Sequence, residues 1–206
     1  MQILRAIDRL AADIAEKSTD GALLVGISGI DASGKGYIAA RLAEQLSCTL
    51  NVAVINVDGW LNLPHVRFSD YEPGLHFYEH ALRLDEMFEL LVRPLKCDRR
   101  IDITADYAEE TSAEFRPHRY LFENVDVILV EGIFLFKRQY LDHFDLKIWV
   151  ECSFDNALKR AVDRSQEGLT TEATIGAYES IYFPAQRIHF DEDEPQNHAD
   201  IILIND

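Results

Sequence analysis

The sequence has few cysteines and no long apolar run, and each shortage excludes a class of protein. Its 206 residues include only 3 cysteines, widely spaced and without a CxxC pair, so we expect reduced thiols rather than disulfides or a zinc site. The longest apolar stretch, Val125 to Phe136, is interrupted by Asp126 and Glu131 and is too short to cross a bilayer. A charge follows early, at Arg5, and the N-terminus has no apolar signal-peptide region, which predicts a cytoplasmic protein.

Positive charge is also scarce. Lys and Arg number 20 against 36 Asp and Glu, so the formal net charge is −16. A nucleic-acid-binding surface needs basic side chains to neutralise phosphates, and anionic lipids attract the same side chains. The composition therefore predicts no nucleic-acid partner and no membrane partner. The length and the 48% hydrophobic content favour a single globular domain over residues 1–206.

Short apolar runs alternate with helical patterns along the chain. Five runs are typical of buried strands, at 22–27, 52–57, 125–130, 146–150 and 199–204. Helical spacing predicts helices over 2–17, 35–47, 76–92, 154–166 and 171–182, the third ending before Pro94 and the last two forming a lid-like region at about 154–183. A polar and aromatic loop is expected from 58 to 75. This alternation predicts an α/β fold of three layers, with helices on both faces of a mainly parallel sheet.

A phosphate-binding motif follows the first predicted strand. Gly29, Gly34 and Lys35 satisfy the GxxxxGK pattern of a P-loop, between a strand and a helix as the motif requires. Backbone N–H groups of the loop and the helix N-terminus would bind phosphates, and Lys35 would reach the β- and γ-phosphates. We therefore predict nucleotide binding by the following continuous stretch: Gly29, Ile30, Asp31, Ala32, Ser33, Gly34, Lys35, Gly36 and Tyr37.

Gly36 departs from the motif, because this position usually carries a Ser or Thr whose hydroxyl binds Mg²⁺. Two interpretations stay open. A water takes the vacant place on Mg²⁺, which commonly keeps several waters, or the chain is a nucleotide-binding sensor or regulatory module with weak or no kinase activity. A GTPase is disfavoured, since no Asn-Lys-x-Asp segment is present to read guanine.

Acidic residues end two other predicted strands. Asp58 follows the second strand, and Glu131 follows the third. At that edge Asp58 is suited to accept the proton of an attacking hydroxyl or to hold Mg²⁺, and Glu131 has the position of a Walker B acid. The alternatives are a turn-forming Asp before Gly59 and a strand-terminal Glu that faces solvent.

Two arginines share a face of the predicted helix 154–166. Arg160 and Arg164 are four residues apart, and we expect them to close over the phosphates. The alternative is surface pairing of Arg160 with Asp163 or Glu167.

An acidic run and a group of aromatic residues give weaker predictions. The acidic run at 191–194 is expected to be a solvated surface before Pro195. One group of aromatic residues either stacks on a planar substrate or forms a small core of the 58–75 loop. Its members are Trp60, Phe68, Tyr71, Phe77 and Tyr78.

These blocks resemble the uridine kinase and phosphoribulokinase family of P-loop small-molecule kinases. The resemblance runs from about residue 20 to 204. It rests on Gly26 to Lys35, Val57-Asp58, Tyr78-Glu79-His80 through Asp85, Ile128 to Gly132, and Leu158 to Arg164. It implies a P-loop nucleotide-kinase-like fold and an ATP- and Mg²⁺-dependent phosphoryl transfer to a hydroxyl of a small molecule, nucleoside-like or related.

The resemblance also implies roles for individual residues. Asp58, Lys35, Arg160 and Arg164 would be catalytic, and Asp58 and Glu131 would hold the metal. Substrate contacts are implied for Glu79, His80, Asp85 and Tyr107, although the first three are equally typical of a helix cap and its first turn. The sequence departs from the family at Gly59-Trp60-Leu61-Asn62, which leaves the acceptor open. The expected partners are ATP and a small-molecule acceptor, and assembly into a homo-oligomer is left open.

Overall fold

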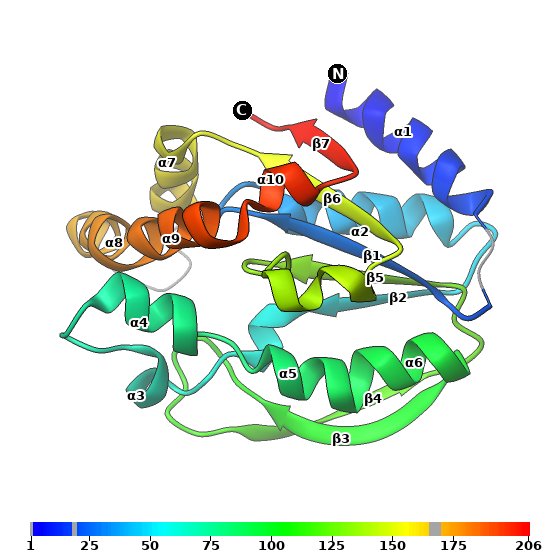
Figure 1. The fold of residues 1–206 in the computed structure, drawn as a ribbon, viewed down its shortest axis with the longest axis horizontal. Helices are drawn as coiled ribbons and strands as arrows, with labels where there is room; N and C mark the ends of the chain where they lie inside the picture. Colours follow the sequence, from blue (N-terminus) through cyan, green and yellow to red (C-terminus); the bar gives the residue numbers. More distant parts are fainter. Residues whose placement is uncertain (1, 18–19, 165–169) are drawn as a thin grey trace.

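A parallel sheet forms the centre of the computed structural model, which describes residues 2–17, 20–164 and 170–206 (Figure 1). Within them, its strands are β1 Leu23–Gly29, β2 Val52–Asn56, β5 Val127–Gly132, β6 Leu146–Glu151 and β7 Ile201–Ile204. They are hydrogen-bonded in the order β2-β5-β1-β6-β7, and every neighbouring pair is parallel. The predicted α/β class with a mainly parallel sheet is confirmed.

The sheet is buried on both faces, which explains why its strands are continuous apolar runs. Val25 and Ile27 of β1 face α1 (Gln2–Ala15) and α2 (Lys35–Leu46), whereas Leu24 faces the opposite layer. That second layer contains α4 (Pro73–His80), a long helix over 84–98 and α9 (Phe183–Asp193) (Figure 1). The three layers place all strand carboxyl ends at one edge.

Two helices continue through a proline. The helix over 84–98 consists of α5 (Leu84–Met87), a π-helical turn η2 (Phe88–Val92) and α6 (Arg93–Asp98), so Pro94 lies inside it. In the same way, α8 (Thr171–Ala177), the π-helical turn η4 (Tyr178–Tyr182) and α9 form one helix around Pro184. A π turn pairs each N–H with the carbonyl five residues earlier, so the hydrogen-bond register shifts just before the residue that lacks an N–H. The predicted helix ends at 92 and 182 were wrong for this reason.

A two-stranded hairpin was also missed. Strands β3 (Ile101–Tyr107) and β4 (Arg116–Phe122) pair antiparallel beside the long helix. Their outer faces carry charged residues such as Asp102 and Arg119, which form an exposed ion pair. The strands therefore lack the continuous apolar character that identified the central strands.

Short elements complete the described chain. They are η1 (Val57–Trp60), α3 (Pro64–Arg67), η3 (Arg138–His143), α7 (Phe154–Arg164) and α10 (Pro195–His198). Among the described residues, none of the helices is long and apolar enough to span a membrane. The cysteines are free thiols, two exposed and Cys152 buried.

Candidate active site

Three neighbouring strands bring the predicted catalytic and metal-binding residues together. Strand β5 lies between β2 and β1, so Asp58 beyond β2, Glu131 in β5 and the loop after β1 lie side by side. A cavity of about 550 Å³ opens at this edge, and its walls include all three groups together with Arg160 and Arg164. The ends of parallel strands are where ligands bind in such sheets.

The loop after β1 has the backbone of a phosphate cradle. Ala32 and Gly34 adopt positive φ angles of 56° and 92°, which turn successive peptide groups away from a regular path. Lys35 begins α2, and its Nζ donates to Ile30 O at 3.3 Å across the loop. Some predicted nucleotide-binding residues line the cavity directly: Asp31, Ala32, Gly34, Lys35, Gly36 and Tyr37. Others form the loop behind them: Gly29, Ile30 and Ser33.

The helix over 171–193 holds the first half of this loop. Asp31 N donates to Gln186 Oε1 at 3.1 Å, and the Tyr178 hydroxyl donates to Asp31 Oδ2. Asp31 Oδ1 also accepts from Ala32 N at 2.8 Å. The loop is therefore tied to the wall opposite the sheet.

The two strand-end acids have unusual pKa values. Burial raises the pKa of Asp58, and the charge of Asp31 acts in the same direction, against the effects of Lys35 and Arg164. Burial also raises the pKa of Glu131 to about 7, although Lys35 opposes it. Two desolvated carboxyl groups near a single lysine are the environment in which a bound divalent cation is favourable. These residues therefore fit the metal that the sequence predicts.

Two sequence neighbours shape this acidic pair. Asp58 N donates to Asn56 Oδ1 at 2.7 Å, which fixes the turn that carries the Asp58 carboxyl group. A Cβ atom placed on Gly36 would lie 3.5 Å from Glu131 Oε1, an ordinary contact. The missing P-loop hydroxyl would therefore have stood beside Glu131, and the space for it is present.

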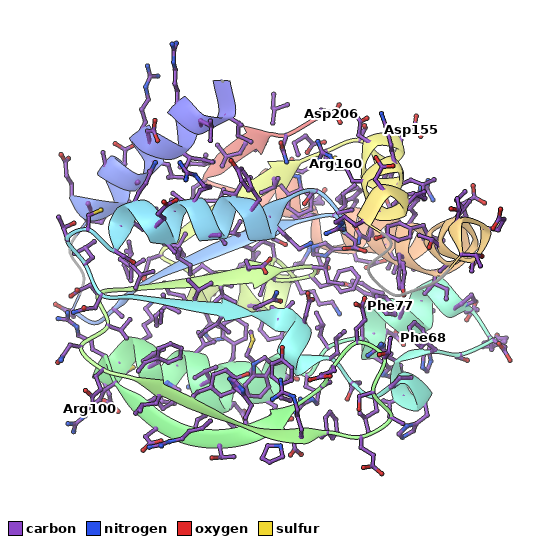
Figure 2. All side chains as sticks on the ribbon, turned by 180° about the vertical axis from the view of Figure 1, so that it is seen from behind. Phe68, Phe77, Arg100, Asp155, Arg160 and Asp206 are labelled. Carbon is purple, nitrogen blue, oxygen red and sulfur yellow. The ribbon has the colours of Figure 1, made fainter. Side chains whose placement is uncertain are left out.

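The predicted arginine pair lies on α7, and Figure 2 labels Arg160 on this helix. Arg160 Nη1 is near Ser33 O at 3.4 Å and Cys152 Sγ at 3.3 Å, so this guanidinium already contacts the phosphate loop. Arg164 lies one turn further along the cavity wall, and its charge lowers the pKa of Asp58. The alternative partner Glu167 lies outside the described residues.

The cavity extends past Asp58 to a second end that the sequence did not predict. Its lining includes Leu61, Arg67, Phe77, Glu110, Ile133, Thr174 and Tyr182, and Tyr178 and Gln186 connect it to the phosphate loop through Asp31. Phe77 packs edge-on against Tyr182 at 5.1 Å and stacks on Phe68 at 5.7 Å, as Figure 2 illustrates for the two phenylalanines. Thr174, Tyr178, Tyr182 and Gln186 lie on the helix over 171–193 and are spaced by four residues. The predicted helix end at 182 left Gln186 outside the helix, so this spacing was not recognised from the sequence. Arg67 and Glu110 had no such signal.

The residues predicted to contact substrate lie elsewhere in the described structure. Glu79 and Asp85 line a separate cavity of about 290 Å³, where the Tyr140 hydroxyl donates to Asp85 at 2.7 Å. His80 packs against His76, with ring centroids 4.5 Å apart. Tyr107 covers Gly59 so closely that a Cβ there would lie 2.4 Å from its ring. The structure thus leaves these four outside the main cavity, and their role as substrate ligands stays a prediction.

The acidic run at 191–194 is not wholly solvated, which corrects the prediction. Asp193 is 5% exposed and accepts hydrogen bonds from the Tyr78 hydroxyl at 2.5 Å and Arg138 N at 3.0 Å. It also shares a hydrogen bond of 2.7 Å with His189 Nδ1. We call Tyr78, His189 and Asp193 the buried triad. It joins α4 to α9, the two helices that carry Phe77 and Gln186.

A P-loop on a parallel sheet, two strand-end acids and an arginine-bearing helix together define a P-loop nucleotide-binding protein of the kinase type. A family model described as "Phosphoribulokinase / Uridine kinase family" matches residues 24–190. The chain is also 32% identical over 189 residues to a uridine kinase of Macrococcus caseolyticus, covering 87% of this chain and 86% of that one.

Solved structures have the same fold. One is a possible uridine kinase from Bacillus stearothermophilus, with a TM-score of 0.80, 21% identity and coverage of 98% of this chain and 100% of that one. Another is the phosphoribulokinase from Rhodobacter spheroides, with a TM-score of 0.61, 14% identity and coverage of 90% and 71%. The chain belongs to the phosphoribulokinase and uridine kinase family. It is an ATP-dependent kinase of small molecules, and a regulatory module without activity is not favoured.

Proposed function

We propose that this kinase phosphorylates a hydroxyl of a nucleoside-like metabolite in the cytoplasm, with Asp58 as general base and Mg²⁺ as cofactor. The observation that carries the proposal is the convergence of Lys35, Asp58 and Glu131 on one cavity that continues into a separate ring-lined end. Phosphoryl transfer needs this arrangement, because the acceptor hydroxyl must lie in line with the γ-phosphorus and the leaving oxygen, with a carboxylate beside the hydroxyl.

The chain's own residues supply most of the chemistry. Lys35 and the loop amides hold the β- and γ-phosphates, and Arg164 and Arg160 add positive charge where it is needed in the transition state. The raised pKa of Asp58 makes its carboxylate a better acceptor for the proton of the attacking hydroxyl. Asn56 keeps the Asp58 turn in place.

Glu131 and Asp58 are the side chains that would hold Mg²⁺, with water in the place of the absent hydroxyl at position 36. When bound, the ion would neutralise charge on the phosphate oxygens. Support comes from the pKa values of both acids, because burial raises them more than nearby positive charge lowers them.

The nucleoside-like acceptor is supported by the relatives named uridine kinase and by the rings of Phe77 and Tyr182 at the far end of the cavity. Aromatic faces bind planar groups well. Arg67 and Glu110 add polar groups there, which suits an acceptor that carries hydrogen-bonding substituents.

An ATP-consumption screen across nucleosides, sugars and vitamin alcohols tests the proposal. One acceptor is expected to raise ATP turnover, and Asp58→Asn is expected to lower kcat by about 10²- to 10⁴-fold, because the general base is lost. Asp70→Asn, at an exposed loop position, is the matched control and should behave as the wild type. The proposal fails if no acceptor stimulates turnover or if Asp58→Asn keeps the wild-type rate.

A further inference from the structure

Two residues directly after β7 contact parts of the nucleotide site that are distant in sequence. Asn205 Nδ2 donates to Ser33 O in the phosphate loop at 2.7 Å. Asp206 Oδ1 accepts from Ser153 N at 2.8 Å and from Asn156 Nδ2 at 2.9 Å, at the start of α7. Figure 2 shows Asp206 beside the helix that carries Arg160. The adjacent pair therefore bridges the loop and the arginine-bearing helix.

The Asn205 contact fixes the orientation of a single peptide group. Peptide bonds in the described chain are trans, so the Ser33 carbonyl and the Gly34 N–H point in opposite directions in one rigid plane. Asn205 and Arg160 both donate to that carbonyl from outside the loop. Holding the carbonyl outward keeps the Gly34 N–H turned toward the inner, phosphate-binding side.

Gly34 is shaped for this contact as well as for the loop. Its φ of 92° lies in the left-handed region, and a Cβ atom there would lie 2.4 Å from Asn205 Nδ2. Because Gly34 has no side chain, there is room for the Asn205 amide group that hydrogen-bonds to the Ser33–Gly34 peptide. The Asn205 backbone N–H donates to Glu151 O at 2.9 Å, so the side chain is anchored to β6.

Asp206 performs the corresponding task at α7. The Ser153 hydroxyl also donates to its Oδ1 at 2.7 Å, and these bonds lower the pKa of Asp206 to about 2. A carboxylate at a helix N-terminus satisfies free backbone N–H groups and favours the helix dipole. The direction of α7, and with it the position of Arg160 and Arg164, is thereby set relative to the loop.

We propose that Asn205 and Asp206 are positioning residues for ATP, which hold the phosphate-binding peptide and the arginine-bearing helix in register. The inference rests on the proposed function only in taking the P-loop as the ATP site. It adds that the two residues directly after β7 determine how well that loop binds phosphate.

The first test is the Asn205→Asp variant, which keeps the size of the side chain but replaces its donor with an acceptor. Calorimetry with ADP should give a Kd about tenfold higher than the wild type, because the carbonyl is no longer held outward. KM for ATP should rise by a similar factor, while KM for the acceptor stays within twofold. Asn197→Asp, at an exposed position of α10, adds the same charge and should leave the ADP Kd unchanged.

The second test separates positioning from bulk stability. Asp206→Ala should lower kcat about fivefold with a smaller effect on ADP binding, and Asp206→Asn should restore most of kcat because it keeps an acceptor oxygen at the same place. Unchanged ADP affinity in Asn205→Asp, or a loss explained entirely by a lower melting temperature, overturns the inference. ADP calorimetry needs no phosphoryl transfer, so this outcome is distinct from a failure to find an acceptor.

Discussion

The two ends of the main cavity are built in different ways. The phosphate end combines the backbone of one contiguous loop with side chains at the ends of adjacent strands. The acceptor end consists of side chains such as Arg67, Phe77 and Tyr182, which come from segments far apart in the chain. Backbone recognition of phosphate is fixed by the fold, whereas side-chain recognition of an acceptor changes with single substitutions. The comparison teaches that nucleotide use and acceptor choice can vary separately in this fold.

The supports of the two ends differ as well. The phosphate end rests on strands that are buried on both faces. The acceptor end depends on how α4 packs against α9, and the buried triad holds that contact. Conditions that break the triad should therefore loosen the acceptor end first.

Among the changes that distinguish the two ends, the largest effect is expected from Tyr182→Leu at the acceptor end. Loss of the ring that packs on Phe77 should raise KM for the acceptor about tenfold, since an aromatic contact contributes on the order of 1 kcal/mol. The ADP Kd should change less than twofold. Steady-state kinetics with calorimetry checks both values, and Tyr71→Leu, at a 78% exposed tyrosine, is the control. Equal losses at both ends would contradict the comparison.

Lowering the pH should change the free energy of unfolding in opposite directions through His189, near the acceptor end, and Glu131, at the phosphate end. Burial lowers the pKa of His189 below its usual 6.5, so the unfolded chain binds a proton there before the folded protein does. The free energy of unfolding should therefore fall as pH drops through 6.5, by up to about 1.4 kcal/mol per pH unit. Glu131 acts the other way, because its raised pKa of about 7 makes the folded protein bind the proton first, which relieves a penalty as pH falls toward 4.5.

Urea unfolding of the wild type and His189→Asn at pH 7 and pH 5.5 separates these contributions. The variant keeps an amide donor toward Asp193 but loses the titrating ring, so its stability should fall less on acidification, by about 1 kcal/mol. His65→Asn, at an exposed histidine of α3, should retain the wild-type pH dependence. If all three proteins lose the same free energy of unfolding between pH 7 and pH 5.5, His189 of the buried triad does not cause the pH dependence.

The smallest effect is expected from Gly36→Ser at the phosphate end. The new hydroxyl would stand beside Glu131, so the Mg²⁺ concentration for half-maximal activity should fall a few-fold. Gly176→Ser, on α8 where an added Cβ meets nothing within 4 Å, controls for the general gain in helix propensity. A Mg²⁺ dependence equal to that of the wild type would mean that water already serves this position.

The sequence predicted that the phosphate loop and the strand-end acids lie together, because their determinants are local. The GxxxxGK loop and the acids after apolar strands are contiguous patterns, and the sheet order brings them together. The acceptor end was missed because its contacts join distant segments, such as Arg67 with Glu110 O and Phe77 with Tyr182. Pro94 and Pro184 also led to wrong helix boundaries, and Asp193 accepts a hydrogen bond from Arg138 N, which is 55 residues away in the chain. Asn205 shows the same limit, since it meets Ser33 across 172 positions.

The π-helical turn η4 has a consequence for how this family can change its substrates. In a regular helix four residues turn about 40° beyond a full circle, so side chains spaced by four drift off any one wall. The wider turn offsets that drift, and Thr174, Tyr178, Tyr182 and Gln186 all reach the same cavity. Removing one residue from this turn would rotate the following helical residues by about 100° around the helix axis. A single-codon deletion would thus change which side chains face the acceptor, and it would also move Gln186, which holds Asp31 of the nucleotide loop.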